Sequence, residues 1–404
     1  MKRLSFLFSL LLCGGLFAQT SVQLPYGLKP IPGEFIVKIK GTSIKPVILQ
    51  AQDGSTDREA NFKLTSALRT RIEGQLAEIA KRNGVSQPAA VFADATVAML
   101  FSNISDDLAK RISQDPDVES VTPNFVFQFP QLPLEFPKIS TQQTTCAVST
   151  AGGPIDGSGK ATWIWILDTG IDLDHPDLNV QTSATFAKSF IAGETVEDGH
   201  GHGTHVAGIA AARNNLFGVV GVSAGARVVP VKVLSNAGGG SFAGVLNGLN
   251  HVAMYDIRGD VINMSLGAYP ISNCENSNAA LRDAIRNLGT AGTFVVMAAG
   301  NDGDCAGSSK NLPGCVNGTN VFTVGSMTCE KACSSFSNWG NPSVDWVAVG
   351  SSVYSTYKNG GYATMSGTSM ASPVVAGIIH ARGGAPLSAG TITCCNGSYR
   401  IAKR

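Results

Sequence analysis

Three short segments place an acid, a base and a hydroxyl where they could do chemistry together. Asp168 ends a short apolar run, and His200, His202 and His205 stand at the start of a segment of small residues. Ser369 opens a second helix-compatible segment. A serine hydroxyl can cleave an amide bond when an imidazole takes its proton and a carboxylate orients that imidazole. The three segments therefore predict nucleophilic hydrolysis.

The expected backbone around these residues suits that reaction. A serine at a helix N-terminus lies at the positive end of the helix dipole, where its own N–H can stabilise developing negative charge. An aspartate at the end of a buried strand can orient a histidine on a neighbouring helix. Burying three such polar side chains without partners would be costly, so a purely structural role in the core explains them less well.

The elements that must position these residues follow from residue 161 onward, where apolar runs alternate with helix-compatible segments. Strands are predicted over residues 162–167, 228–234, 261–265, 293–299 and 321–324. Helices are predicted over residues 202–213, 242–255, 279–288 and 368–380. This alternation predicts an α/β fold with a mostly parallel, doubly wound sheet and helices on both faces, which binds ligands at the carboxyl ends of its strands.

The chain ahead of this domain divides into three parts. Residues 1–18 carry a basic start, an apolar run over residues 4–12 and small residues near Ala18, which predicts a signal peptide and secretion, extracellular or periplasmic. Residues 19–130 predict a small α+β domain of the split βαβ type. Residues 131–160 are rich in Pro and Gly, as in a linker, and the main domain is assigned to residues 161–404.

Charge and cysteine usage narrow the possible partners. The net charge of +1 gives no electrostatic reason to expect nucleic acid or an anionic membrane surface as a partner. No stretch after the signal reaches the roughly 20 apolar residues of a membrane span. If Cys13 leaves with the signal peptide, eight cysteines remain, which predicts disulfides in an exported protein. Cys305–Cys315 and Cys329–Cys333 are the short-loop candidates.

The three segments resemble the signatures of the subtilase family, in the order Asp, His, Ser. They read ILDTGID at residues 166–172, DGHGHGTHVAG at residues 198–208 and MSGTSMASP at residues 365–373. The resemblance covers roughly residues 160–382, and residues 199–208 and 336–340 resemble the proteinase K branch. It implies a secreted serine endopeptidase that needs no cofactor for catalysis, forms an acyl-enzyme and acts on protein and peptide substrates, and we expect a monomer.

The resemblance also implies roles for individual residues. Ser369 would be the nucleophile, His202 the general base and then acid, and Asp168 the residue that orients His202, with His205 structural. Asn301 follows the segment Ala298-Ala299-Gly300, which is similar to the family's oxyanion-hole segment. Its side-chain amide would stabilise the tetrahedral intermediate beside the backbone N–H of Ser369.

Two further segments are similar to those that flank an extended substrate in the family. They contain Ser265, Leu266, Gly267 and Ala268, and Gly239, Gly240 and Ser241. The pocket for the side chain before the scissile bond would be lined by Gly267, Ala268, Ala298 and Gly300. Because these segments contain no acidic residue, we expect a preference for apolar or aromatic side chains.

Residues 19–130 resemble the inhibitor-like propeptides of subtilases, which implies an intramolecular inhibitor that is removed by self-cleavage between about Phe129 and Cys146. The family commonly binds structural calcium, and Asp345, with carbonyls near Thr319 and Val321, resembles such a site. A solvated surface role for Asp345 is the alternative. The C-terminal residues 383–404 are strand-like and shorter than is usual in the family.

Two functions of other classes remain open on the sequence alone. His200, His202 and His205 could bind a metal and make the protein a metallohydrolase. Alternatively, the chain could be a catalytically inactive binding or inhibitory protein with the same fold. Sensitivity to chelators and labelling by a fluorophosphonate distinguish these alternatives from a serine peptidase.

Overall fold

Strand β6 (Ile164–Asp168) explains why the apolar run ahead of Asp168 is continuous. Ile164 and Ile166 belong to one hydrophobic core, whereas Trp165 and Leu167 belong to a second core on the opposite face of the sheet. Successive side chains of a strand point to opposite faces, so a strand covered on both sides needs an apolar residue at every position. All five residues of β6 are buried.

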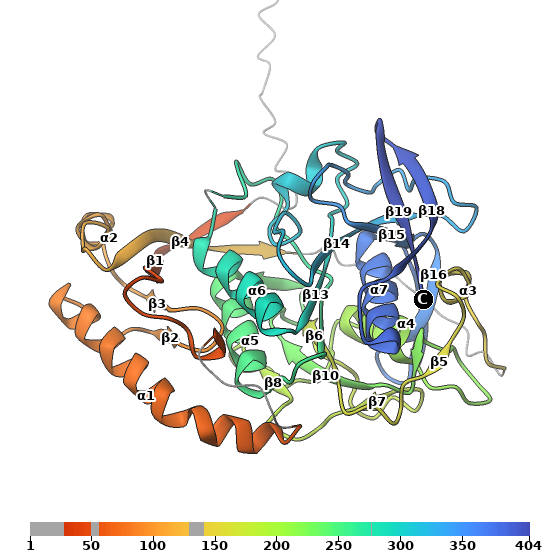
Figure 1. The fold of residues 1–404 in the computed structure, drawn as a ribbon, viewed down its shortest axis with the longest axis horizontal. Coiled ribbons are helices and arrows are strands. Elements are labelled where there is room, and N and C mark those ends of the chain that lie inside the picture. Colours follow the sequence, from red (N-terminus) through yellow and green to blue (C-terminus); the bar gives the residue numbers. More distant parts are fainter. Residues whose placement is uncertain (1–27, 50–55, 129–140, 276) are drawn as a thin grey trace, which may run out of the picture.

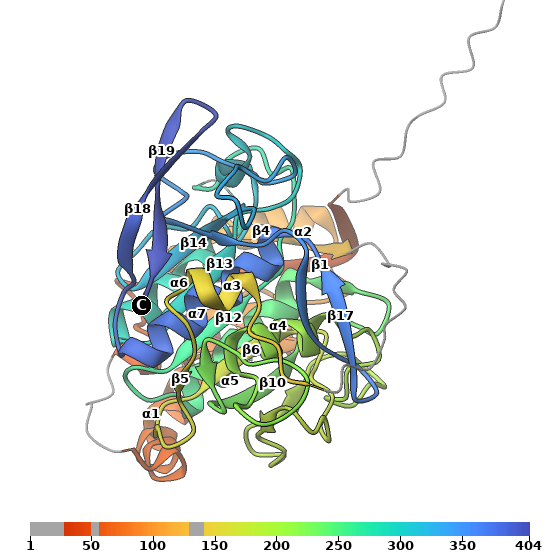
Figure 2. The same cartoon turned by 90° about the vertical axis from the view of Figure 1, so that its right-hand side faces the viewer.

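The computed structural model describes residues 28–49, 56–128, 141–275 and 277–404 (Figures 1 and 2). The predicted signal peptide, residues 1–18, lies outside them. β6 belongs to a ten-stranded sheet of order β18-β19-β15-β14-β13-β12-β6-β10-β7, in which β8 also pairs with β10. Its other strands are β7 (Asn179–Val180), β8 (Lys188–Ser189), β10 (Arg227–Lys232), β12 (Val261–Met264), β13 (Phe294–Ala298), β14 (Val321–Met327), β15 (Trp346–Val349), β18 (Leu387–Cys394) and β19 (Gly397–Lys403). The β18–β19 pair is antiparallel, and the other pairs are parallel.

Helices cover both faces of this sheet. α5 (Phe242–Tyr255) and α6 (Ala279–Ala291) contribute to the core on one face, and α4 (His202–Ala211) and α7 (Thr368–Arg382) contribute to the core on the other. The protein therefore has the expected α/β fold. The five predicted strands and four predicted helices of this domain are confirmed, with boundaries that differ by a few residues.

The described N-terminal residues form a second, smaller unit, drawn in red and orange in Figure 1. Its elements are β1 (Lys29–Ile39), a 3-10 turn at Val47–Leu49, α1 (Arg58–Arg82), β2 (Ala90–Phe92), β3 (Ala98–Phe101), α2 (Asp106–Ile112) and β4 (Val118–Gln128). The sheet order is β11-β4-β1-β3-β2, in which β11 (Gly239–Ser241) comes from the main domain. α5 and α6 lie between this sheet and the ten-stranded sheet, because they contact strands of both.

Four disulfides join segments that are distant in the sequence. They pair Cys146 with Cys329, Cys274 with Cys315, Cys305 with Cys395 and Cys333 with Cys394. The short-loop predictions Cys305–Cys315 and Cys329–Cys333 are therefore wrong. Two of the bonds attach the C-terminal hairpin β18–β19, which extends the main sheet beside β15, and a third attaches the short helix α3 (Cys146–Thr150).

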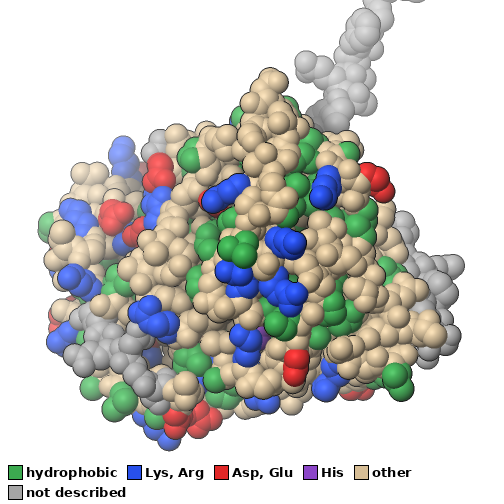
Figure 3. Space-filling view, turned by 45° about the vertical axis from the view of Figure 1, so that its right-hand side comes forward, with side chains coloured by type: hydrophobic (Ala, Val, Ile, Leu, Met, Phe, Trp, Pro, Cys, Tyr) green, Lys and Arg blue, Asp and Glu red, His purple; other side chains and the backbone are tan. Residues whose placement is uncertain are grey.

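Small elements complete the described chain. They are β5 (Ile155–Asp156) paired with β9 (Ser223–Ala224), the hairpin of β16 (Val353–Tyr357) and β17 (Gly361–Met365), and a 3-10 turn at Gly307–Lys310. On the face in Figure 3, acidic, basic and hydrophobic side chains are interspersed, with several Lys and Arg side chains near the centre. Within the described residues, no helix is both long and apolar enough to cross a membrane.

Candidate active site

Asp168 and His202 form a buried hydrogen-bonded pair. Asp168 ends β6, and His202 is the first residue of α4, at the carboxyl end of the sheet. The Nδ1 of His202 lies 2.7 Å from Oδ1 of Asp168, and the two side chains are 8% and 0% exposed. The Asp168 Oδ1 also accepts the backbone N–H of Thr169 at 2.7 Å. The bond to Nδ1 orients the imidazole so that Nε2 is the nitrogen available for proton transfer.

Two glycines allow α4 to begin so close to Asp168. Gly201, at the N-cap, has φ 103°, a left-handed conformation that other residues rarely adopt. A Cβ on Gly203 would lie 2.1 Å from the carbonyl oxygen of Gly170 and 3.2 Å from Cβ of Asp168. Only a residue without a side chain fits there, so the close approach of His202 to Asp168 depends on Gly203.

Ser369 is the second residue of α7 and is 8% exposed. Its Oγ donates to the carbonyl of Ser265 at 3.2 Å, while Oγ of Ser265 donates to the carbonyl of Ser369 at 2.7 Å. Asn263 donates to Oγ of Ser265 at 2.9 Å and accepts from Ser372 at 2.8 Å. This chain of bonds attaches the start of α7 to the end of β12 and fixes the position of the serine.

A pocket of about 160 Å³ opens at Ser369. Its lining includes Leu266, Gly267, Ala298, Gly300, Asn301 and Ser369, all singled out by the sequence. It also includes Phe127, Gln128, Tyr269, Asp302, Asn311 and Thr368, which were not. Ala268 is not part of this lining; it is 1% exposed and pairs with Leu312. Asp302 brings a carboxylate to the wall, where it accepts a hydrogen bond from Asn338 at 2.9 Å.

The orientation of Asn301 is fixed by Thr368. The Oδ1 of Asn301 accepts the Thr368 backbone N–H at 2.8 Å and its hydroxyl at 2.9 Å. The hydroxyl oxygen of Thr368 in turn accepts the N–H of Gly300 at 3.1 Å. Because the carbonyl end of the amide is used in this way, its NH2 group is the end that can donate to a ligand in the pocket.

The last strand of the N-terminal unit lies in the same region. β4 pairs antiparallel with β11, so that Gln128 lies opposite Gly239, Phe127 opposite Gly240 and Val126 opposite Ser241. Gln128 also donates to the carbonyl of Ala237 at 3.4 Å. The segment Gly239, Gly240 and Ser241 thus binds an extended strand by main-chain hydrogen bonds.

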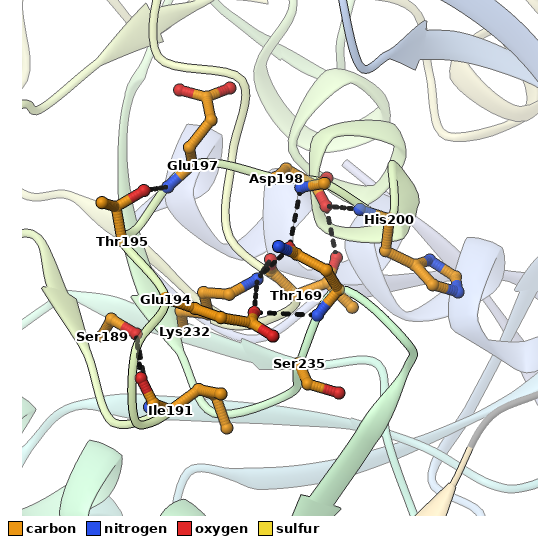
Figure 4. A network of polar contacts seen from close by, with 12 residues as sticks. Thr169, Ser189, Ile191, Glu194, Thr195, Glu197, Asp198, His200, Lys232 and Ser235 are labelled. Atoms are coloured by element: carbon orange, nitrogen blue, oxygen red, sulfur yellow. Dashed lines mark hydrogen bonds and ion pairs between the residues drawn. The ribbon is translucent and has the colours of Figure 1, made fainter.

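The sequence analysis missed two residues that support Asp168 and His202, namely Asp198 and Lys232 (Figure 4). Asp198 accepts from the hydroxyl of Thr169, the N–H groups of His200 and Gly201, and both the N–H and the hydroxyl of Thr204, at 2.7–3.1 Å. An Asp a few residues ahead of a helix is a capping signal that could have identified it.

Lys232 lies opposite Asp168 in the parallel pair of β10 and β6, and its side chain is fully buried. Its ammonium donates to the Thr169 carbonyl and, at 2.9 Å, to Oδ1 of Asn236, and lies 3.3 Å from Oε2 of Glu194 (Figure 4). A lysine within an otherwise apolar run was the signal available in the sequence. Lys232 and Asp198 together fix Thr169, the neighbour of Asp168.

The three histidines of the cluster have different environments. Burial favours the neutral imidazole of His202, but the adjacent Asp168 carboxylate outweighs it and raises the pKa of His202 above its usual value. Burial lowers the pKa of His200 and lowers that of His205 to about 3. The Nε2 of His205 lies 3.1 and 3.0 Å from the carbonyls of Val353 and Ala363, where it joins α4 to the β16–β17 hairpin. This is a structural environment for His205.

No group of three or more His, Cys, Asp or Glu residues within the described parts of the chain is arranged to hold a metal ion. The metallohydrolase alternative therefore finds no support in the arrangement of His200, His202 and His205. At the predicted calcium site, Oδ2 of Asp345 accepts the N–H of Thr323 at 2.8 Å. Asp345 is half-buried, and burial of its carboxylate raises its pKa to about 6.

With this geometry in place, comparison with known proteins identifies the class. A profile of the subtilase family matches residues 159–381, so the chain belongs to that family and is a serine endopeptidase. It is 40% identical over 220 residues to subtilisin DY of Bacillus licheniformis, covering 54% of this chain and 75% of that protein. It is 34% identical over 301 residues to subtilisin amylosacchariticus of Bacillus subtilis subsp. amylosacchariticus, covering 74% and 73%. A cold-adapted subtilisin-like serine proteinase of known structure matches with 34% identity and a TM-score of 0.47, over 55% of this chain and 74% of that one.

Proposed function

We propose that this subtilase hydrolyses peptide bonds through Asp168, His202 and Ser369. The single observation that carries the proposal is the buried 2.7 Å bond between Asp168 and His202. His202 begins α4, which packs against α7, the helix that carries Ser369 in its first turn. Oγ of Ser369 attacks the scissile carbonyl while its proton passes to Nε2 of His202. The protonated imidazole then gives that proton to the leaving amine, and an ester to Ser369 remains. Water then attacks this ester while His202 takes its proton, and His202 returns the proton to Oγ of Ser369 as the carboxylic acid product leaves.

The negative oxygen of the tetrahedral intermediate is stabilised by two donors in this proposal. They are the NH2 group of Asn301, whose orientation is set by Thr368, and the backbone N–H of Ser369 at the start of α7. Preorganised donors of this kind are worth most where charge develops during the reaction. Asp168 keeps its negative charge and stabilises the imidazolium.

We further propose that the N-terminal unit is an inhibitory propeptide that occupies the substrate cleft. The pairing of Val126, Phe127 and Gln128 with β11, and the presence of Phe127 and Gln128 in the pocket lining, support this assignment. An extended substrate would pair with the same strand, so the two compete for one position. The cut would fall between about Phe129 and Cys146, a region largely outside the described residues.

The decisive experiment compares the wild-type precursor with Ser369→Ala in a host that lacks other proteases. The wild-type chain should lose its N-terminal unit and should label with a fluorophosphonate, whereas the variant should keep that unit and stay unlabelled. Lys110→Ala, on the exposed side of α2, is a matched surface control and should process normally. Normal processing of Ser369→Ala would refute self-cleavage, and failure of the processed wild type to label would refute a serine nucleophile.

Secretion is part of the proposal. The predicted signal peptide over residues 1–18 and the four disulfides support export, since disulfides persist in oxidising compartments. Intact mass of the secreted product, with and without reduction, tests this directly. We expect a mass that lacks residues 1–18 and the N-terminal unit and rises by eight hydrogens, from the four disulfides, on reduction.

Specificity and calcium complete the proposal. We expect faster cleavage after apolar or aromatic side chains than after Lys or Arg, because Leu266, Ala298 and two glycines contribute to the pocket wall, where Asp302 supplies the single carboxylate among the lining residues described. A panel of short chromogenic peptides tests this.

A calcium ion at Asp345 would stabilise its buried carboxylate, although this one carboxylate supplies few of the six to eight oxygens that calcium needs. Calcium should raise the melting temperature of the wild type and not of Asp345→Asn.

A further inference from the structure

A second buried contact between the two units lies at the other end of the main sheet. Asp260 and Trp163 directly precede strands β12 and β6, which are parallel, so they lie at the amino ends of those strands. Asp168 is at the carboxyl end of β6, about 16 Å further along a strand that rises about 3.3 Å per residue. The contact is therefore separate from the cleft.

The group that fills this contact is the side chain of Arg58, from the first turn of α1. Its two terminal nitrogens donate to the two carboxylate oxygens of Asp260 at 2.5 and 2.8 Å, and to the carbonyls of Tyr255 and Ala161 at 3.0 and 3.1 Å. Its guanidinium carbon lies 3.7 Å from the centre of the Trp163 ring. Figure 1 shows one end of α1 reaching the main domain. A carboxylate beside an aromatic face suits the planar guanidinium fork of arginine better than the compact ammonium of lysine.

The carboxylate is held by the main domain without help from Arg58. The Oδ1 of Asp260 accepts the N–H of Trp163 at 2.9 Å, and Oδ2 accepts Nε1 of Trp165 at 2.8 Å and the N–H of Ile257 at 3.3 Å. We therefore expect Asp260 to keep its position when Arg58 is absent. A preorganised anion beside an indole face is a binding site, and not merely one half of an ion pair.

We propose that Asp260, Trp163 and the carbonyls of Tyr255 and Ala161 form a guanidinium-binding pocket of the peptidase domain, whose occupant in the precursor is Arg58. This proposal deepens the proposed function, because it assigns the pocket the role of keeping the N-terminal unit bound after the chain is cut. The pocket and the β4–β11 pairing are two separate contacts of one unit, which also docks along α5 and α6. Each contact raises the local concentration of the other, so losing one should speed release strongly.

Other contacts also join the units. Asn250 accepts the N–H groups of Asp94 and Ala95 at 2.8 and 3.2 Å, and Asn124 accepts the N–H of Ala243 at 3.0 Å, but these bonds join neutral groups. Lys38 pairs with Asp283 at 3.1 Å, but that carboxylate is 34% exposed, and exposed pairs contribute little. Phe62 stacks on Tyr255 with ring centres 4.9 Å apart, directly beside Arg58. The side chains of Arg58 and Asp260 are 4% and 0% exposed, so the charge of Arg58 is withdrawn from water on binding.

The test uses the full chain with Ser369→Ala, so that it does not depend on self-cleavage. A recognition site for an unrelated specific protease is introduced within residues 129–140, the chain is cut there, and dissociation of the N-terminal unit is followed by size-exclusion chromatography. Arg58→Ala should release the unit about 30-fold faster or more. Arg71→Ala, an exposed arginine on the same helix, is the matched control and should change the rate less than twofold.

Adding a small cation to the Arg58→Ala variant tests whether the pocket binds a guanidinium group. Ethylguanidinium is the fragment that Arg58→Ala removes, and it should slow release of that variant several-fold, whereas the same concentration of ethylammonium should not. Asp260→Asn should abolish the rescue. If Arg58→Ala does not fold, Arg58→Lys replaces it, with an expected increase of about tenfold. Release no faster than in Arg71→Ala, or equal rescue by ethylammonium, would overturn the pocket while leaving the protease assignment intact.

Discussion

Two fully buried carboxylates, Asp168 and Asp260, lie at opposite ends of the neighbouring parallel strands β6 and β12, and they make different hydrogen bonds. Both oxygens of Asp260 accept hydrogen bonds, from Arg58, the Trp163 N–H and the Trp165 indole among others. Asp168 uses Oδ1 for His202 and Thr169, while its Oδ2 has no hydrogen-bond partner within the described residues.

The difference distinguishes a structural contact, between Asp260 and Arg58, from a contact that we propose takes part in catalysis, between Asp168 and His202. A saturated carboxylate fixes a permanently charged guanidinium in one geometry. An incompletely saturated carboxylate keeps more of its negative charge available to an imidazole that gains and loses a proton. Unsatisfied buried polar atoms cost stability, so the arrangement at Asp168 sacrifices stability at the place where we propose that chemistry occurs.

Replacing each of the two carboxylates, Asp168 and Asp260, with asparagine should give the largest difference in kcat. Asp168→Asn removes the charge that stabilises the imidazolium and favours the wrong tautomer of His202, so kcat should fall about 10⁴-fold, as in other serine proteases. Asp260→Asn should change kcat of the processed enzyme less than tenfold, because it lies far from Ser369. Turnover of a chromogenic peptide by enzyme processed in trans measures both. Equal losses from the two substitutions would contradict the comparison.

Asn301 tests whether the charge that develops near Ser369 is stabilised as proposed. Asn301→Ala removes a donor that acts chiefly in the transition state, so kcat should fall about 10²–10³-fold with little change in KM, by analogy with the measured effect in subtilisin. Asn311→Ala, at another part of the pocket wall, is the control and should affect KM more than kcat. A loss confined to KM in Asn301→Ala would assign Asn301 to substrate binding instead.

Much of the fold could be predicted, because its determinants are local. The buried strands are continuous apolar runs, and α5 was predicted with its observed bounds. In the structure Ser241 caps this helix by accepting the N–H of Gly244. Small residues around His202 and Ser369 indicated the positions of α4 and α7. The order of these elements predicted the α/β sheet, and motif residues indicated the wall of the pocket.

The rest depends on contacts between distant residues. Cys146 and Cys329 are 183 positions apart, and nothing near either cysteine indicates its partner. Arg58 stands among other charged residues at the start of a helix, where an arginine is ordinarily solvated, so its insertion beside Asp260 had no local signal. Phe127 and Gln128 reach the pocket because an entire unit docks on α5 and α6. Such contacts are set by the tertiary structure.

The pH dependence of activity tests whether His202 is the catalytic histidine. Only neutral His202 can accept the proton of Ser369, and the Asp168 carboxylate raises its pKa. Hence kcat/KM should fall about tenfold per pH unit below an inflection that lies above about 6.5, the ordinary histidine value. Asp168→Asn should move the inflection to lower pH. A wild-type inflection below 6.5 would contradict the electrostatic role of Asp168.

His205 should affect acid stability and not the activity profile. Burial lowers its pKa to about 3, so between pH 3 and about 6.5 the unfolded chain binds a proton that the folded protein does not. Its contribution to the free energy of unfolding is therefore complete above pH 6.5 and decreases by about 1.4 kcal/mol per unit as the pH falls toward 3. His205→Gln should be less stable at pH 7 but lose less stability on acidification. Asp345, with a raised pKa of about 6, has the opposite effect, because its contribution to stability increases as the pH falls. This effect is the same in both proteins, so the difference between their melting curves isolates His205. Parallel loss of stability in both would show that His205 is protonated in the folded protein, and that the buried carbonyls of Val353 and Ala363 accept from a charged ring.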